Sequence, residues 1–196
     1  YNDQNRFTGW KDVELNEQGI SEAEQAVDLL ENINFDIAFT SKLKRANDTL
    51  DIILKGIKQT SIPVEKNLAL NERDYGDLIG QNKAEAAKEF GEEQVQIWRR
   101  SYDIPPPGGE SLKDTADRVI PYLNEKILPH VIEGKNVIVS AHGNSIRAIV
   151  MALKGFSSDE ILQTEIGWCE PWIFEFEGNK LTTVSYTHLR AHETHD

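Results

Sequence analysis

Long apolar runs, cysteine and net positive charge are all scarce in this sequence, and each scarcity excludes a class of protein. No run of about 18 apolar residues occurs, so no membrane-spanning helix is expected. A single cysteine, Cys169, excludes an intrachain disulfide framework and fits a reducing compartment. Lys and Arg number 21 against 33 Asp and Glu, and the net charge of −12 disfavours nucleic acid and anionic membranes as partners. We therefore expect a cytoplasmic protein that binds neither.

The residues that are present fit one folded domain. The chain has 196 residues, of which 39% are hydrophobic and 28% charged, which is ordinary for a globular protein with a sizeable core. We assign residues 1–184 to this domain. Residues 185–196 show no apolar periodicity and resemble translated vector sequence, so we interpret them as a non-native extension. Three of the five histidines lie there, and no metal site is predicted from them because no surrounding ligand shell supports one.

Apolar spacing predicts strands that alternate with helices along the chain. The predicted strands are Asp36–Ser41, Ile62–Val64 at a sheet edge, Asn136–Ser140, which is the clearest buried strand, and Trp172–Phe176. The predicted helices are Ser21–Ile33, Leu43–Lys58, Lys83–Arg100 in two pieces around Gly91, Ser111–Val131 with Pro121 at a start or kink, and Ile146–Leu153. Such alternation predicts an α/β domain with a largely parallel sheet.

Polar groups follow two of the predicted strands. After Thr40 and Ser41 comes a helical turn that carries Arg45, and after Ser140 come His142 and a glycine turn at the start of a helix. Ligands of parallel sheets bind beyond the carboxyl ends of the strands, and a helix N-terminus attracts anions. His142 could there donate a hydrogen bond to a phosphoryl oxygen. The alternative is that it only caps the helix or bonds a buried carbonyl.

Two other segments carry groups suited to anion chemistry. Glu72 lies in a loop dense in titratable groups and is a candidate general acid or base; the alternative is a solvated loop with a local ion pair. Arg99 and Arg100 are adjacent in an acidic chain, and guanidinium groups match carboxylate and phosphate bidentately. The alternative for this pair is a helix end whose carbonyls attract cations. Together these segments predict a pocket for a small, doubly anionic ligand.

At these residues the chain resembles the bisphosphoglycerate-dependent phosphoglycerate mutases of the histidine phosphatase superfamily. The resemblance is carried, in chain order, by Asn5–Trp10 (NRFTGW), Thr40–Ala46 (TSKLKRA), Leu70–Gly76 (LNERDYG), Asn82–Glu85 (NKAE), Trp98–Arg100 (WRR) and Ala141–Ser145 (AHGNS). It implies a three-layer α/β fold and an isomerase of glycolysis and gluconeogenesis that acts on small phosphoglycerates. It further implies 2,3-bisphosphoglycerate as the primer and no metal. The family's usual insertion is nearly absent at Pro107–Glu110, which leaves monomer and homodimer open.

The resemblance also implies roles for individual residues. Glu72 would exchange a proton with the substrate hydroxyl, and His142 would stabilise the transferring phosphoryl group. Lys83, Arg99 and Arg100 would hold the carboxylate and the non-reacting phosphate. The other implied ligand contacts are Asn2, Thr8, Gly9, Arg45, Arg73, Asp74, Tyr75, Gly143 and Asn144.

The family's nucleophile is a histidine in an Arg-His-Gly motif, and Tyr1-Asn2 resembles the end of that motif. We therefore expect the first strand and the nucleophilic histidine to be missing from this chain, and the chain alone to be inactive. Two other functions stay open. A phosphomonoesterase on the same fold would pass the phosphoryl group to water, and the shortened loop favours it. A non-catalytic metabolite-binding module would fit a chain without the nucleophile.

Overall fold

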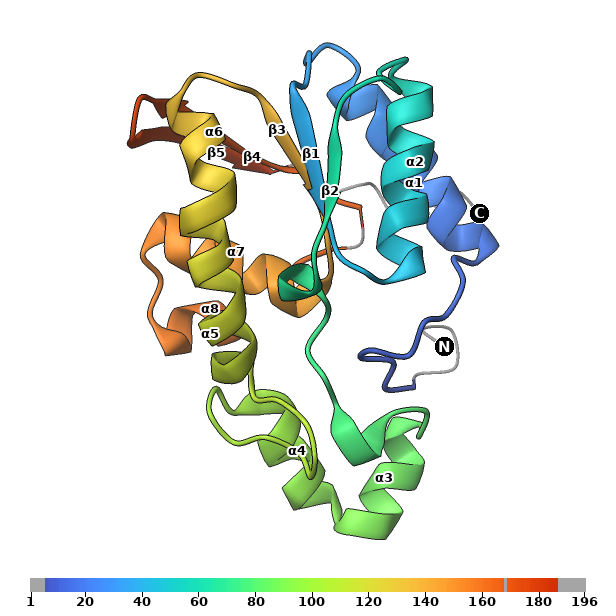
Figure 1. Ribbon diagram of the computed structural model, residues 1–196. Helices are drawn as coiled ribbons and strands as arrows, with labels where there is room; N and C mark the ends of the chain where they lie inside the picture. The colour runs from blue at the N-terminus through green and yellow to red at the C-terminus, as the bar shows by residue number, and fades with distance from the viewer. Residues whose placement is uncertain (1–5, 168, 187–196) are drawn as a thin grey trace, which may run out of the picture.

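A parallel sheet of three strands, in the order β2-β1-β3, organises the fold (Figure 1). The computed structural model describes residues 6–167 and 169–186. The central strand β1 (Ile37–Thr40) is wholly buried and pairs in parallel with β2 (Val64–Lys66) and β3 (Val137–Ser140). Thr40 is in register with Ser140, so the chain segments that follow β1 and β3 leave the sheet side by side. This register confirms that the two polar strand exits meet.

Helices cover both faces of this sheet, as Figure 1 shows. Successive side chains of a strand point to opposite faces. Ala38 therefore packs into one cluster with α1 (Glu17–Leu30) and α2 (Lys44–Gly56), whereas Phe39 packs into another with α5 (Leu112–Tyr122) and α7 (Gly143–Lys154). The predicted α/β class and the three layers are confirmed.

A smaller helical unit lies below the sheet in Figure 1 and is built from α3 (Lys83–Phe90) and α4 (Glu92–Arg100). Gly91 separates the two helices with a φ of 90°, so the prediction of two pieces around this glycine is confirmed. A separate apolar cluster holds this unit together; it consists of Phe7, Leu78, Ala86, Val95 and Trp98. Helices α3 and α4 are thereby packed against Phe7 and the 3₁₀ turn that contains Leu78.

Two predicted helix starts are wrong because the capping residues lie earlier in the chain. Helix α1 begins at Glu17 rather than Ser21, since the side chain of Asn16 accepts a hydrogen bond from Gly19 N at 2.8 Å. Helix α7 begins at Gly143 rather than Ile146, because His142 has extended backbone and occupies the cap position.

The helix predicted over residues 111–131, with a start or kink at Pro121, is confirmed in its extent and changes pitch just after this proline. It divides into α5, a π-helical turn (Leu123–Ile127) and α6 (Leu128–Ile132). Pro121, in the last turn of α5, has no N–H for the helical ladder, which accounts for the change of pitch that follows it. Ser111 caps α5 in a reciprocal capping box with Asp114.

The remaining elements refine the predicted strands. The edge strand begins at Val64, just after Pro63, and β3 is mostly half-buried, so β1 rather than β3 is the most buried strand. A hairpin of β4 (Trp172–Glu177) and β5 (Lys180–Tyr186) follows the short helix α8 (Ser158–Leu162), and β5 was not predicted.

The other short elements are two 3₁₀ turns, Leu68–Leu70 and Gly76–Leu78. Ser185 and Tyr186 belong to β5, while Asn2 and the histidines of residues 187–196 lie outside the described residues. None of the described helices is long and apolar enough to cross a membrane.

Candidate active site

His142 and Ser41 meet at the ends of β3 and β1. A hydrogen bond of 2.7 Å joins His142 Nε2 to Ser41 Oγ, which also accepts from Leu43 N at 3.1 Å. The backbone N–H of His142 donates to Ser145 Oγ at 3.0 Å, which fixes the start of α7. His142 therefore caps the helix, as the alternative drawn from the sequence proposes, and its ring also contacts Ser41, while its contact with a phosphoryl oxygen stays a prediction.

The imidazole of His142 is only 8% exposed and is uncharged. Burial, aided by the positive charges of Arg45 and Arg118, lowers the pKa of His142 from 6.5 to about 3. A neutral imidazole offers one N–H donor and one acceptor. His142 can therefore bind an oxyanion by hydrogen bonding, while nearby guanidinium groups supply the positive charge.

Glu72 reaches the same helix start from the loop that follows the first 3₁₀ turn. Its Oε1 accepts hydrogen bonds from Arg73 N at 2.8 Å and from Asn144 N at 3.1 Å. A Cβ at Gly143 would lie 3.8 Å from Oε2, so that oxygen also faces α7. The carboxylate thus occupies part of the anion-binding helix N-terminus that the sequence predicted. Glu72, His142, Gly143 and Asn144 are brought together.

Tyr75 closes one side of this group. Its Oη accepts a hydrogen bond from Asn144 Nδ2 at 3.1 Å, and its ring lies 5.1 Å from that of Phe7. Burial, and then the charge of Glu72, raise the pKa of Tyr75, so the phenol stays neutral. Gly9 touches Tyr75 closely: its φ is 51°, and a Cβ there would come within 3.1 Å of Tyr75 N. A side chain at this position would separate the loop of Thr8 and Gly9 from the site.

Arg45 also ties this N-terminal loop to the site. Its Nη1 donates to Lys11 O at 2.9 Å and its Nη2 donates to Gly9 O at 2.8 Å. Burial lowers the pKa of Arg45, an effect that the charges of Glu72 and Asp12 oppose. The guanidinium group thus binds the loop by hydrogen bonds and interacts electrostatically with the carboxylate of Glu72.

Arg73 and Asp74 bond to the protein backbone in this structure. Arg73 is 3% exposed, and its guanidinium donates to Glu110 O at 2.6 Å and to Trp98 O at 2.8 Å. The Asp74 carboxylate accepts from Gly76 N at 2.9 Å. Both side chains position the Glu72 loop and the end of α4.

Lys83, Arg99 and Arg100 form a cluster of cations at the start of α3 and the end of α4. Burial lowers the pKa of Lys83, and the charges of Arg99 and Arg100 lower it further. Burial and then Arg100 likewise lower the pKa of Arg99. Within the described part of the chain, no carboxylate forms an ion pair with any of the three. Such an uncompensated cluster favours a ligand with more than one negative charge.

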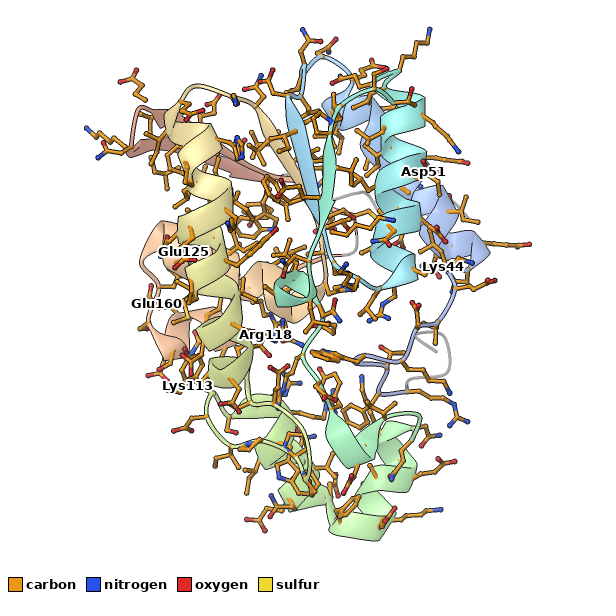
Figure 2. The ribbon with its side chains drawn as sticks, viewed as in Figure 1. Lys44, Asp51, Lys113, Arg118, Glu125 and Glu160 are labelled. Atoms are coloured by element: carbon orange, nitrogen blue, oxygen red, sulfur yellow. The ribbon has the colours of Figure 1, made fainter. Side chains whose placement is uncertain are left out.

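Arg118, which was not predicted, holds the Glu72 loop in place from α5 (Figure 2). Its Nε and Nη2 bond the two carboxylate oxygens of Glu110, each at 2.8 Å. Its Nη1 donates to Ala69 O at 2.7 Å and Asn71 O at 3.0 Å, and its Nη2 donates to Glu72 O at 2.9 Å. The carbonyls it binds are 46 to 49 positions away in the chain, so no local pattern marks Arg118.

No cluster of three or more His, Cys, Asp or Glu side chains that could hold a metal ion occurs within residues 6–167 and 169–186.

We expect Arg118→Met to lower the free energy of unfolding by about 3 kcal/mol, because it leaves the Glu110 carboxylate and several loop carbonyls unpaired. The matched control is Lys113→Met on the same helix. Lys113 pairs with Asp117, but these side chains are 53% and 61% exposed, against 20% for both members of the Arg118–Glu110 pair. The control should change stability by less than about 0.5 kcal/mol. Urea denaturation measures both, and equal losses would contradict the assignment.

We also expect the His142 ring to stay neutral in mildly acidic solution. Its pKa is lower in the folded chain than in the unfolded chain, so the unfolded state takes up the proton first as the pH falls below 6.5. The stability that neutral His142 contributes is therefore complete above pH 6.5 and is lost as the pH falls toward 3. Ring ¹⁵N shifts of His142 should be constant from about pH 7.5 to about pH 5 in the folded protein and titrate in urea. Titration of the His142 ring near pH 6.5 in the folded protein would refute the expectation that the ring stays neutral.

Comparison with known proteins agrees with this geometry. The model of the histidine phosphatase superfamily (branch 1) matches residues 1–188. A protein of Nitrobacter hamburgensis named 2,3-bisphosphoglycerate-dependent phosphoglycerate mutase is 55% identical over 193 residues, which cover 97% of this chain and 93% of the relative. A protein of the same name from Bradyrhizobium diazoefficiens is 54% identical over 181 residues, covering 91% of this chain and 87% of the relative.

Solved structures share the fold. YhfR of Bacillus stearothermophilus superposes with a TM-score of 0.82 at 23% identity, covering 92% of this chain and 88% of that one. A mycobacterial glucosyl-3-phosphoglycerate phosphatase does so with a TM-score of 0.79 at 24% identity, covering 97% and 93%. From the sequence match and the shared fold, we conclude that the chain belongs to the histidine phosphatase superfamily.

Proposed function

We propose that this protein is a 2,3-bisphosphoglycerate-dependent phosphoglycerate mutase, an isomerase that interconverts 3-phosphoglycerate and 2-phosphoglycerate in glycolysis and gluconeogenesis. The observation that carries the proposal is the cluster of Lys83, Arg99 and Arg100, which lacks carboxylate partners among the described residues. A mutase must hold a second anionic group while the first reacts, and this cluster supplies the charge for it. Relatives that are 51–55% identical carry the name of this activity.

The two ends of the ligand have separate binding groups in this proposal. Lys83, Arg99 and Arg100 hold the carboxylate and the non-reacting phosphate. Arg45 and His142 surround the transferring phosphoryl group, the first by charge and the second by a hydrogen bond from its neutral ring. Fixed groups of this kind do most of the work in phosphoryl transfer, because its transition state needs positioning and charge compensation.

Glu72 moves the proton. Its Oε1 is held by two backbone N–H groups, whereas Oε2 accepts no hydrogen bond from the described residues. Oε2 is therefore the oxygen that takes the proton from the substrate hydroxyl that accepts the phosphoryl group, and that later gives the proton to the substrate oxygen from which a phosphoryl group departs. Thr8, Gly9, Gly143 and Asn144 complete the ligand contacts, while Arg73, Asp74 and Tyr75 shape the wall that carries them.

The primer implied by the name of the relatives is 2,3-bisphosphoglycerate, which supplies the phosphoryl group that starts the cycle. The residues present fit it, because cations act on both sides of the group. Arg45 interacts electrostatically with Glu72 and Arg99 with Tyr75, and burial followed by the charges of Arg99 and Arg100 lowers the pKa of Lys83. The same residues would hold the primer and the substrates.

One observation favours a phosphomonoesterase as the second candidate. The short loop before α5 packs on the Glu72 loop: Asp77 N donates to Pro107 O at 2.9 Å and Glu110 N donates to Asp74 O at 2.7 Å. Gly109 permits this contact, since a Cβ there would lie 2.6 Å from Asp74 O. A loop bound in this way supports the wall of the site rather than covering it, and a mutase needs water to be excluded.

The deciding experiment measures conversion of 3-phosphoglycerate to 2-phosphoglycerate with and without 2,3-bisphosphoglycerate. It uses a version of the protein that carries the family's Arg-His-Gly segment ahead of Tyr1. We expect conversion only when the bisphosphate is present. Release of free phosphate without isomerisation would transfer the assignment to the phosphomonoesterase.

In the active version, Glu72→Gln should lower kcat about 10²- to 10⁴-fold, because the amide cannot exchange the proton but can still accept the two backbone hydrogen bonds. The matched control is Asp77→Asn, an exposed carboxylate on the same loop, and it should leave kcat within about twofold. A steady-state assay at saturating substrate measures both. A Glu72→Gln variant with undiminished kcat would remove Glu72 from the mechanism.

A further inference from the structure

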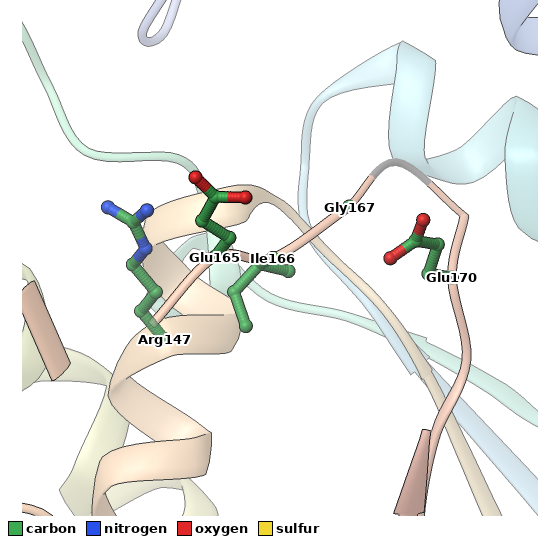
Figure 3. A pocket seen from close by; sticks show the side chains of 5 residues that line it. All are labelled: Arg147, Glu165, Ile166, Gly167 and Glu170. Atoms are coloured by element: carbon green, nitrogen blue, oxygen red, sulfur yellow. The ribbon is translucent and has the colours of Figure 1, made fainter. Parts of the chain in front are cut away.

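A pocket of about 350 Å³ lies beside α7 and has no part in the mechanism above (Figure 3). Its lining comes from Arg147 on α7 and from the segment between α8 and β4; that segment contributes Glu165, Ile166, Gly167 and Glu170. Figure 3 shows the side chains of Arg147 and Glu165 pointing to the same side. The pocket therefore has one cation and two carboxylates around it.

Arg147 lacks a partner in this pocket. Its Nε is buried and bonds to no acceptor, and among the described residues its guanidinium forms no ion pair. A buried N–H without an acceptor is unfavourable, and buried donors in folded proteins are nearly always paired. A ligand oxygen that bonded Arg147 would remove this penalty.

The two carboxylates do not neutralise Arg147. Glu170 folds over Gly167, where a Cβ would lie 2.6 Å from its Oε1, and it already has an interaction of its own. Glu165 is exposed to solvent, and its carboxylate is beyond ion-pair distance from Arg147. Arg147 is thus free to bind an incoming anion.

The position of Arg147 on α7 connects this pocket to the active site. Arg147 is one helical turn after Gly143, so the two residues share a face of the helix. Side chains of a helix lean toward its N-terminus, and Gly143 is where the carboxylate of Glu72 lies. The pKa of Tyr75 is consistent with this position of Arg147. Burial is the main cause of the raised pKa, and the charge of Arg147 is one of the effects that oppose the rise.

We propose that this pocket is an anion subsite next to the active site, in which Arg147 binds a carboxylate or phosphate group of a ligand whose other end lies near Glu72. The proposal rests on the proposed function, because it takes the ligand to be a phosphorylated hydroxy acid. The planar guanidinium suits either oxyanion. Arg147 then contacts the ligand from α7, whereas Lys83, Arg99 and Arg100 contact it from α3 and α4.

Isothermal titration calorimetry tests this with three ligands: 3-phosphoglycerate, glycerol 3-phosphate, which lacks the carboxylate, and glycerate, which lacks the phosphate. Arg147→Met should weaken the binding of 3-phosphoglycerate about tenfold, as expected for the loss of a charge-assisted hydrogen bond. Lys126→Met, which removes an exposed charge from the π-helical turn, should change the affinity less than about twofold. Glu165→Gln should strengthen binding, because it removes a repelling charge.

The ligands identify the group that is bound. If Arg147 binds the carboxylate, Arg147→Met leaves glycerol 3-phosphate unaffected; if it binds the phosphate, glycerate is unaffected. Unchanged affinity of Arg147→Met for all three ligands overturns the subsite alone. An unmodified chain that binds none of them overturns the proposed function as well.

An NMR measurement on the unmodified chain tests the contact without relying on the folding of the Arg147→Met variant. In the unmodified chain, the ¹H–¹⁵N resonance of Arg147 Nε should shift on saturation with 3-phosphoglycerate, but not with sodium chloride of equal ionic strength. A resonance that responds to neither, while calorimetry shows that the ligand is bound, rules out contact with Arg147.

Discussion

The bidentate pair of Arg118 and Glu110 is the interaction on which the candidate site depends. Arg118 comes from α5, and its remaining N–H groups hold carbonyls of the loop that carries Glu72. Glu110 in turn accepts a hydrogen bond from Asp74 N at 2.9 Å. The loop between the two 3₁₀ turns is thereby fixed on both sides of Glu72. Only a planar group with five donors can bond one carboxylate and several carbonyls at once, so lysine could not replace Arg118 without loss.

The parallel sheet supplies the second constraint. Because Thr40 and Ser140 are in register, Ser41 and His142 leave the sheet as neighbours and form a buried hydrogen bond. Burial among guanidinium groups then keeps His142 uncharged. A second positive charge at this depth would be costly, whereas a neutral ring still has a hydrogen bond to offer an oxyanion. The positions of the strand ends therefore explain why the histidine supplies a neutral hydrogen bond while the arginines supply the positive charge.

Much of this arrangement was predictable from the sequence because it depends on local patterns. Buried strands with small polar residues at their ends predict a ligand site, and Gly91 separates two helices because its φ of 90° suits glycine. The parts that were missed depend on contacts between distant segments. In the sequence, Arg118 is one more charged residue on an amphipathic helix. Arg147 is likewise unmarked, because its pocket is formed by the segment after α8, which is distant in the chain. The helix starts were placed too late because Asn16 caps α1 ahead of Ser21, and His142, the alternative cap that the sequence offered, caps α7.

The cations of the site fall into two groups by what they bond, and this division explains how an acidic protein can attract an acidic ligand. Arg73 and Arg45 donate to backbone carbonyls, and Arg118 donates both to backbone carbonyls and to the carboxylate of Glu110. Lys83, Arg99, Arg100 and Arg147 have no carboxylate partner among the described residues. The first group makes the loops rigid, and the second keeps positive charge without a carboxylate partner at the start of α3, at the end of α4 and on α7. With a net charge of −12 over the whole chain, attraction of a phosphoglycerate must come from these few groups at short range, because the overall charge repels it. Rigid loops then matter as much as charge: a guanidinium that could fold onto one of the many surface carboxylates would cease to attract the ligand.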